Sequence, residues 1–387
     1  MPLILGEWFC MDDGRSSFLP ELPKDANLLF CHDDIIKNKI ITGIEMRFAT
    51  KKPIKMLVYG DWGVGKTHLM HHIRWWLARN QSDYPTYPVI IEIGDITKKS
   101  RFDDIVRPFL DSLGIHFLVD LVHQYRGKEP NVAAGLRDKG IASHIAEAFN
   151  KILLGSPGQP PVDLVVQSFE YLKGRRVSGQ AGIGLGQSLE ESQEFYQVLF
   201  SIGEMYRRVN DGTHILFVAD EAAKLESVDA DEATQNHWMT ANKFIFDDQN
   251  NSFGFIYTVS GKQEKNLPRA IWDPQIQNRL GKGYVYRLDN LATEGVDSYL
   301  TKLLQEFIDW NKVDSLVASG QIDSAQFNRD AYPFTTEGRN RFIDYFNQNQ
   351  EDAKPRDISQ NLDLLSFQAG KRGQRLITPD IVETLGT

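Results

Sequence analysis

The chain has 387 residues and a formal net charge of −9, so it is long enough for two or three domains and is not a uniformly basic nucleic-acid coat. Its two cysteines, Cys10 and Cys31, are too few for a disulfide framework or a zinc site, and this usage is typical of a reducing cytoplasm. No run of about 18 apolar residues and no secretory signal are apparent, so we expect a cytoplasmic protein without a membrane span.

The first hundred residues predict an arm followed by alternating helices and strands. Residues 1–31, punctuated by proline and aspartate, predict an extended N-terminal arm. Apolar residues at helical spacing predict a helix over His32–Thr50 and another over His68–Arg79. Continuous apolar runs predict buried strands at Lys55–Tyr59 and Val89–Ile93.

The middle of the chain, at about 97–210, predicts a long helical insertion between two strands. Glycine-rich breaks at 155–161 and 174–186 separate its apolar stripes. The helices are expected at Phe102–Leu113, Ile115–Tyr125, Gly140–Leu154, Val162–Leu172 and Glu190–Arg208.

Three more strands follow, at Ile215–Ala219, Gly254–Val259 and Tyr284–Arg287, and the chain beyond them is helical in pattern. Buried strands that alternate with helices indicate an α/β fold with a central parallel sheet. We therefore expect an N-terminal arm (1–31), a nucleotide-binding domain (32–292) that carries the insertion, and a helical lid (293–387).

The sequence GDWGVGKT at 60–67 matches the phosphate-loop pattern G-x-x-x-x-G-K-[ST] at every fixed position, between a predicted strand and a predicted helix. Its glycines let backbone N–H groups face phosphates, and the helix start adds partial positive charge. Lys66 can reach the β- and γ-phosphates of ATP, and the Thr67 hydroxyl can hold Mg²⁺. The alternative is a glycine-rich turn that merely precedes a helix. The expected nucleotide contacts are Gly60, Asp61, Trp62, Gly63, Val64, Gly65, Lys66, Thr67 and His68.

An acidic pair, Asp220 and Glu221, directly follows the third buried strand. Open α/β sheets bind ligands at the carboxyl ends of their strands. Asp220 would orient the Mg²⁺ shell together with Thr67, and Glu221 would act as general base on the attacking water. The alternative is an acidic pair favoured by a helix N-terminus.

Through its phosphate loop and acidic pair, the chain resembles the AAA+ ATPase family, and in particular its initiator-like branch of origin-recognition and transposon target-selecting ATPases. The resemblance covers roughly residues 32–95 and 212–385. It implies a P-loop NTPase fold, ATP and Mg²⁺ as ligands, ATP hydrolysis at subunit interfaces, and assembly into a homo-oligomeric ring or filament.

The resemblance also implies roles for residues outside the two motifs. Thr258 in GFIYTVSG would sense the γ-phosphate, with Ser260 in reserve; the alternative is a threonine that simply favours a strand. Arg279 would be an arginine finger that reaches a neighbouring subunit, with Arg269 as the other choice, or else a surface arginine at a helix C-terminus. Arg356 would be the lid's sensor arginine, or else an exposed arginine at a helix start.

The insertion is much longer than the compact AAA+ core. Its segment FEYLKG at 169–174, followed by the helix at 190–208, resembles ATP-binding proteins of BREX-type phage-defence islands. That short match suggests a subfamily without establishing one.

Three basic clusters could contact a nucleic-acid backbone, although each is also typical of a solvated surface: Lys51–Lys55, Lys173–Arg176 and Lys371–Arg375. We expect a Mg-dependent AAA+ ATPase that assembles on or remodels DNA, or a DNA-acting partner such as a nuclease or transposase, in a defence or mobile-element system. The alternative is an ATP-gated signalling switch without nucleic-acid contact. A metabolic P-loop kinase fits poorly, since no acceptor-substrate base besides Glu221 is apparent.

Overall fold

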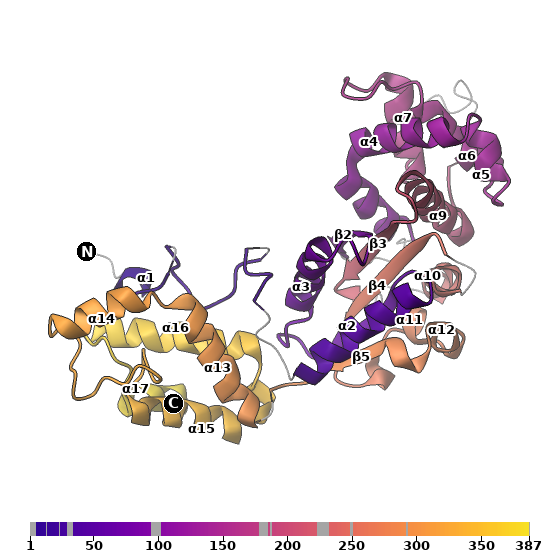
Figure 1. The fold of residues 1–387 in the computed structure, drawn as a ribbon. Helices are drawn as coiled ribbons and strands as arrows, with labels where there is room; N and C mark the ends of the chain where they lie inside the picture. Colours follow the sequence, from indigo (N-terminus) through magenta and orange to yellow (C-terminus); the bar gives the residue numbers. More distant parts are fainter. Residues whose placement is uncertain are drawn as a thin grey trace. The chain divides into compact units, whose positions relative to one another are not determined.

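The computed structural model describes residues 5–12, 14–22, 24–28, 34–93, 102–177, 185, 188–222, 232–247, 251–291 and 293–386. The chain divides into two compact units. One comprises residues 38–60 and 73–287 and holds the sheet; the other comprises residues 1–37, 61–72 and 288–387 and is largely helical (Figure 1).

A five-stranded sheet in the order β2-β3-β4-β1-β5 forms the centre of the first unit (Figure 1). The pairings β1–β4, β2–β3 and β3–β4 are parallel. Every residue of β1 is buried, as expected for a strand covered on both faces. All five predicted strands are present: β1 (Lys55–Gly60), β2 (Thr86–Glu92), β3 (His214–Asp220), β4 (Phe253–Ser260) and β5 (Val285–Leu288).

The helices α10, α11 and α12 lie in the sheet unit, whereas α2 and α3 each span the division between the two units. Besides α2 and α3, which were expected, the chain forms a helix between β3 and β4 and two short helices before β5. The bounds are α2 (Asp34–Ala49), α3 (Lys66–Arg79), α10 (Glu232–Phe246), α11 (Arg269–Trp272) and α12 (Pro274–Leu280), with 3₁₀ turns at Glu264–Asn266 and Lys282–Tyr284.

The helical insertion shares a core with the sheet. Phe109 of its first helix packs against Phe217 of β3 at a ring-centroid distance of 4.7 Å and against Phe255 of β4 at 5.9 Å. The same buried cluster continues into the insertion through Tyr125 and Phe149. The insertion is therefore built onto the core of the sheet unit.

The first two helices expected in the insertion form one element with a kink. Gly114 lies between them with φ 80° and ψ 158°, a backbone geometry that glycine adopts readily and that interrupts the helix. The helices of the insertion are α4 (Asp103–Lys128), α5 (Val132–Arg137), α6 (Ser143–Ile152), α7 (Asp163–Leu172) and α9 (Ser192–Val209).

The second unit is helical at its C-terminal end, as predicted. Its buried residues form a separate core, which includes Leu300, Tyr332, Phe342 and Leu362. Its helices are α13 (Thr293–Phe307), α14 (Trp310–Ala318), α15 (Thr336–Gln348), α16 (Pro355–Lys371) and α17 (Pro379–Val382), with 3₁₀ turns at Gln350–Asp352 and Glu383–Gly386. The predicted fold class is confirmed: α/β, with a parallel sheet, a helical insertion and a helical C-terminal region.

The N-terminal segment differs from the extended arm that its sequence suggests. It contains the short helix α1 (Leu5–Trp8), and Phe9 and Phe18 are fully buried in the core of the helical unit. Arg15 and Asp25 form a buried ion pair, and the Arg15 guanidinium lies 3.8 Å from the centroid of the Phe307 ring. The segment folds because C-terminal helices cover its aromatic side chains, which local pattern alone does not reveal.

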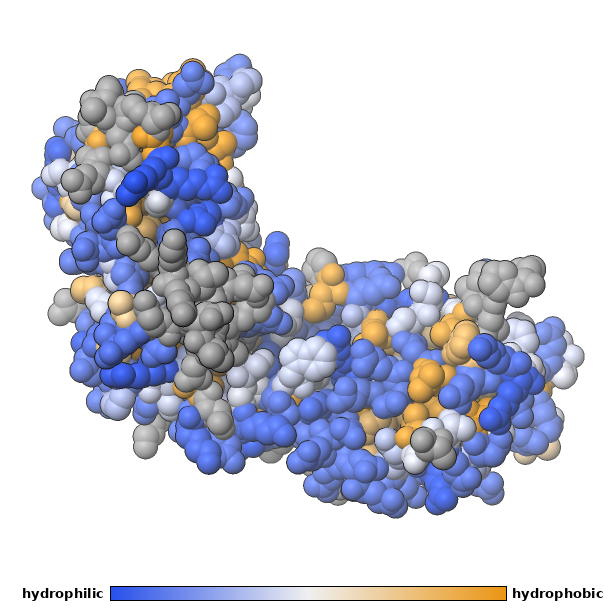
Figure 2. Space-filling model, turned by 180° about the vertical axis from the view of Figure 1, so that it is seen from behind, coloured by the Kyte–Doolittle hydropathy of each residue, from blue (hydrophilic) through white to orange (hydrophobic). Residues whose placement is uncertain are grey.

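Some positions named in the sequence lie outside the described residues: Cys31, His32, residues 97–101 at the start of the insertion, and residues 178–184 and 186 of the glycine-rich break at 174–186. In the part of the chain that is described, no helix combines the length and apolarity that a membrane span requires. The face shown in Figure 2 is mainly hydrophilic, with scattered apolar patches. The proposed boundaries at 31, 292 and 293 stay predictions.

Candidate nucleotide site

The phosphate loop connects the end of β1 at Gly60 to the start of α3 at Lys66. Gly63 and Gly65 have φ angles of 83° and 96°, in the left-handed region that disfavours residues with a Cβ. Gly65, a fixed position of the pattern, and Gly63, at a variable one, therefore both meet a conformational requirement. The predicted order of buried strand, loop and helix is present as expected.

Lys66 is 7% exposed, and its Nζ donates to the Asp61 carbonyl oxygen across the loop at 2.8 Å. The Asp61 side chain accepts from the Trp62 N–H at 2.9 Å, and Thr67 is exposed in the first turn of α3. A buried ammonium, left-handed glycines and a helix N-terminus together suit an anionic polyphosphate. The donor set thus fits ATP, with Thr67 as the residue that would hold Mg²⁺ from this side.

The first turn of α16 lies against the phosphate loop. Lys354 Nζ is 3.0 Å from Asp61 Oδ2, and the Arg356 guanidinium carbon is 4.0 Å from the centroid of the Trp62 ring. A Cβ added to Gly63 would lie 3.5 Å from the Lys354 side chain and 3.6 Å from that of Arg356. The structure therefore brings Arg356 to the loop, whereas its sensing of phosphate stays a prediction.

The N-terminal segment also contacts the phosphate-loop helix. His72 Nδ1 is 3.0 Å from the Ala26 carbonyl oxygen, and His68 Nε2 contacts the Leu28 carbonyl oxygen. Burial lowers the pKa of His68, and its contact with Leu28 opposes that shift in part. These contacts could not be predicted, because nothing in the pattern of residues 24–28 pairs them with residues 40 or more positions away.

The acidic pair and Thr258 form a hydrogen-bonded group in the sheet unit. The Thr258 hydroxyl, fully buried, donates to Asp220 Oδ1. The Glu221 N–H donates to the same Asp220 oxygen at 3.0 Å and lies 3.3 Å from Thr258 Oγ1. Thr258 is thus placed beside the candidate metal ligand and general base, and its role as phosphate sensor stays a prediction.

Glu221 has a φ of 58°, in the left-handed region that few residues other than glycine adopt. Such strain persists only where surrounding contacts hold the backbone, and it concentrates at functional sites. Here the Glu221 N–H donates to the buried carboxylate of Asp220, the residue immediately before it. This geometry is consistent with the predicted role of Glu221.

Strand register places these groups at one edge of the sheet. Gly60, the last residue of β1, is paired with Ser260, the last of β4, and Thr258 is paired with Val58. On its other side β4 pairs with β3, which ends at Asp220. Because the strands are parallel, their carboxyl ends meet at the edge where α/β sheets bind ligands. Ser260 lies at this edge, half-buried.

The two candidate arginine fingers lie on short helices of the sheet unit. Arg279, near the end of α12, has Nε 3.5 Å from Asp247 Oδ2, and its Nη1 donates to the Gln275 carbonyl oxygen at 2.9 Å. Arg269 is exposed at the first position of α11. Both arginines are at the surface, and the structure leaves the choice between them as a prediction.

Much of the charge in the three basic clusters is engaged within the protein. Lys55 is buried and contacts the Asp247 carbonyl oxygen. Lys173 is buried between Asp111 (2.6 Å) and Glu170 (2.8 Å), and Arg372 pairs with Asp380 at 2.6 Å. Many cations of the three clusters are thus bound to groups of the protein itself, which favours the solvated-surface interpretation.

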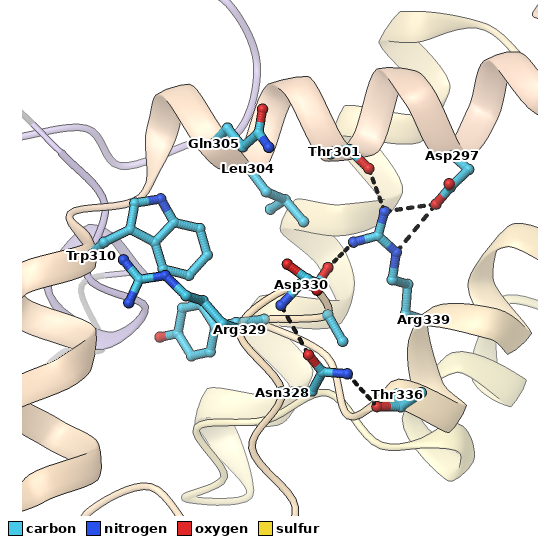
Figure 3. Close-up of a pocket in the computed structure, with 12 residues that line it drawn as sticks. Asp297, Thr301, Leu304, Gln305, Trp310, Asn328, Arg329, Asp330, Thr336 and Arg339 are labelled. Atoms are coloured by element: carbon cyan, nitrogen blue, oxygen red, sulfur yellow. Dashed lines mark hydrogen bonds and ion pairs between the residues drawn. The ribbon is translucent and has the colours of Figure 1, made fainter.

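A separate cavity of about 470 Å³ lies in the helical unit, between α13, the start of α14 and the segment before α15 (Figure 3). The Arg339 guanidinium is held there by Asp297 Oδ1 at 2.6 Å and Thr301 Oγ1 at 2.6 Å. Arg329 lies over the Trp310 ring at 4.9 Å and pairs with a carboxylate of α14. Both arginines of the cavity are paired with carboxylates of the protein, so the cavity does not resemble a phosphate site.

Among the described residues, no cluster of three or more His, Cys, Asp or Glu side chains could hold a metal ion. That finding is compatible with Mg²⁺, because magnesium bound to nucleotides is usually held by one or two protein oxygens, water and phosphate. That Thr67 and Asp220 hold Mg²⁺ stays a prediction.

No protein-family model matches the chain, and no curated protein matches it. Among solved structures it is similar to the ORC1 protein of Aeropyrum pernix in complex with DNA (11% identity, TM-score 0.45), over 94% of this chain and 66% of that one, just under two thirds. It is similar to ORC2 of the same organism, at 11% identity and a TM-score of 0.48, over 97% of this chain and 71% of that one. It also resembles the RuvB Holliday junction branch migration motor of Thermotoga maritima, at 10% identity and a TM-score of 0.41, over 95% of this chain and 71% of that one. Such likeness concerns the fold, and the chemistry depends on the residues of this chain.

Replacing Thr258 by valine should lower the free energy of unfolding by about 1–3 kcal/mol, because a buried carboxylate, Asp220, loses a hydrogen-bond donor at constant side-chain shape. Urea denaturation followed by tryptophan fluorescence measures the change. Ser260→Ala, two residues further along β4, is the matched control and should stay within about 0.5 kcal/mol of the wild type. Equal effects of the two substitutions would contradict the assigned hydrogen bond.

Proposed function

We propose that this chain binds and hydrolyses ATP with Mg²⁺, as an ATPase of the AAA+ class. The observation that carries the proposal is the phosphate loop, in which left-handed Gly63 and Gly65 and the buried Lys66 join a buried strand to a helix N-terminus. The hydrogen bonds that Asp220 accepts from Thr258 and from the Glu221 N–H support its proposed role as a metal ligand, with Glu221 as the base. The arginine that α16 places at the loop supports the AAA+ assignment.

Each residue has a defined task in this proposal. Lys66 would neutralise the phosphates, and Thr67 and Asp220 would hold the metal, whose charge stabilises the transferring phosphoryl group. Glu221 would accept a proton from the attacking water at its carboxylate. Thr258 would hold Asp220 in position through the observed hydrogen bond. Arg279 would act from a neighbouring copy, which requires a homo-oligomer.

We propose further that the energy is used on DNA or on a DNA-acting partner, such as a nuclease or transposase in a defence or mobile-element system. Exposed Arg176, next to the glycine-rich stretch, is the cation of the basic clusters best suited to such a contact. The alternative, an ATP-gated switch without nucleic-acid contact, remains the competing proposal.

Lys66→Ala should abolish ATP binding, because the buried ammonium is lost. Glu221→Gln should retain ATP while turnover falls at least 100-fold, because the general base is removed and the Asp220 carboxylate remains. Equilibrium binding of labelled ATP and phosphate release measure the two properties. Glu264→Gln, an exposed carboxylate on another turn, is the control and should keep wild-type turnover. Full turnover in Lys66→Ala would refute the site.

Arg279→Ala should reduce ATP turnover at least tenfold while the isolated subunit still binds nucleotide, because an arginine in trans stabilises charge on the transferring group. The wild-type rate per subunit should rise with protein concentration as copies assemble. Arg269→Ala serves as the comparison and should retain most of the activity. A rate per subunit that is independent of concentration over the range in which assembly is measured would exclude a finger in trans.

Affinity for duplex DNA should increase when ATP is added and should fall steeply between 50 and 200 mM salt, since phosphate contacts release counterions. Arg176→Ala should weaken this binding, whereas Arg329→Ala, an exposed arginine paired with Asp314, should not. Fluorescence anisotropy of a labelled duplex measures both. Absence of binding at low salt would favour the switch without nucleic-acid contact.

A further inference from the structure

Trp62 is an exposed tryptophan inside the phosphate loop. Its side chain is 53% exposed, at a position where the loop pattern accepts any residue. One face of its ring meets the guanidinium of Arg356, 4.0 Å from the ring centroid. The loop therefore presents an aromatic surface to the first turn of α16.

The first turn of α16 is an unfavourable place for two cations. Lys354 is the N-cap of the helix and Arg356 follows one residue after Pro355, so both lie at the positive end of the helix dipole. Asp61 pairs with Lys354 at 3.0 Å. Within the described residues, the Arg356 guanidinium makes its ring contact and no hydrogen bond or ion pair. Its positive charge thus lies beside the loop against an aromatic face, and Asp357 of the same turn interacts with it electrostatically.

An arginine can stack on a ring and donate hydrogen bonds at the same time. Stacking uses the flat face of the guanidinium, and its five N–H donors project from the edges, in the plane. The Trp62 contact therefore fixes where the Arg356 charge lies and leaves its donors for a further acceptor. The side chains of Lys354 and Arg356 also lie close to the loop backbone at Gly63.

We propose that Trp62 is a positioning residue, which holds the Arg356 guanidinium over the phosphate loop so that it meets the terminal phosphate of a nucleoside triphosphate and favours a triphosphate over a diphosphate. Asp61 assists by docking Lys354 of the same helical turn. This inference rests on the proposed nucleotide-binding function.

The test compares the affinities of the full chain for ADP and for a non-hydrolysable ATP analogue. Trp62→Ala should reduce the preference for the triphosphate about two- to fivefold, the size of an exposed cation–π contact, with ADP affinity nearly unchanged. Trp62→Phe should retain most of the preference. In an Arg356→Ala background, which itself loses the preference, Trp62→Ala should have no further effect.

Phe367→Ala is the matched control. Phe367 is an exposed aromatic residue on the same helix α16, and Lys371 Nζ lies 4.6 Å from its ring centroid. Its removal should leave both affinities unchanged. A Trp62→Ala variant that weakens ADP and the analogue equally, or that acts equally in the Arg356→Ala background, would overturn the proposal and reduce Trp62 to a structural role.

A second measurement needs no nucleotide. Amide hydrogen exchange over residues 354–362 should be faster in Trp62→Ala than in the wild type, because the first turn of α16 loses its contact with the loop; unchanged exchange would overturn the docking. The two proposals fail separately. A wild type that binds neither nucleotide refutes the proposed function, whereas a wild type that binds both without Trp62-dependent selectivity refutes only this inference.

Discussion

The left-handed backbone at Gly63 and Gly65 is the constraint on which the candidate site depends. It turns the chain from the end of β1 into α3, so that Lys66 begins a helix and its amine reaches back to the Asp61 carbonyl oxygen. A side chain at either glycine would strain this turn. The side chains of Lys354 and Arg356 lie within van der Waals contact distance of the place that a Cβ at Gly63 would take. One backbone requirement thus shapes the phosphate cradle, against which a cationic helix lies.

The phosphate loop and the acidic pair are each ordered by contacts inside their own unit. The phosphate loop belongs to the helical unit, together with the cations of α16 that contact it. The carboxylates of Asp220 and Glu221 belong to the sheet unit, where Thr258 holds Asp220 by a buried hydrogen bond. Arg356 can therefore keep its place at the loop through contacts inside the helical unit, independently of those that order the acidic pair.

The parts of the fold predictable from sequence are those with a local signal. Apolar runs located all five strands, and helical spacing located most helices, since burial on one face repeats along the chain. The kink at Gly114 and the folding of the N-terminal segment depend on tertiary contacts, such as Arg15 against Phe307, that no local pattern encodes. In the site, the motifs identified the loop and the acidic pair. The stacking of Arg356 on Trp62 joins residues almost 300 positions apart and could not be read from either neighbourhood.

The partner of a cation indicates what that cation can still bind. Lys173 is buried between two carboxylates, and Arg372 is paired with Asp380, so binding a phosphate there would first require breaking an ion pair. Arg356 instead has an aromatic face as its partner, which stabilises the charge without using the N–H donors. Its position at a helix N-terminus adds potential of the same sign. For this reason Arg356, rather than the more conspicuous basic clusters, is the cation that α16 would offer, beside Lys66, to an anion at the phosphate loop.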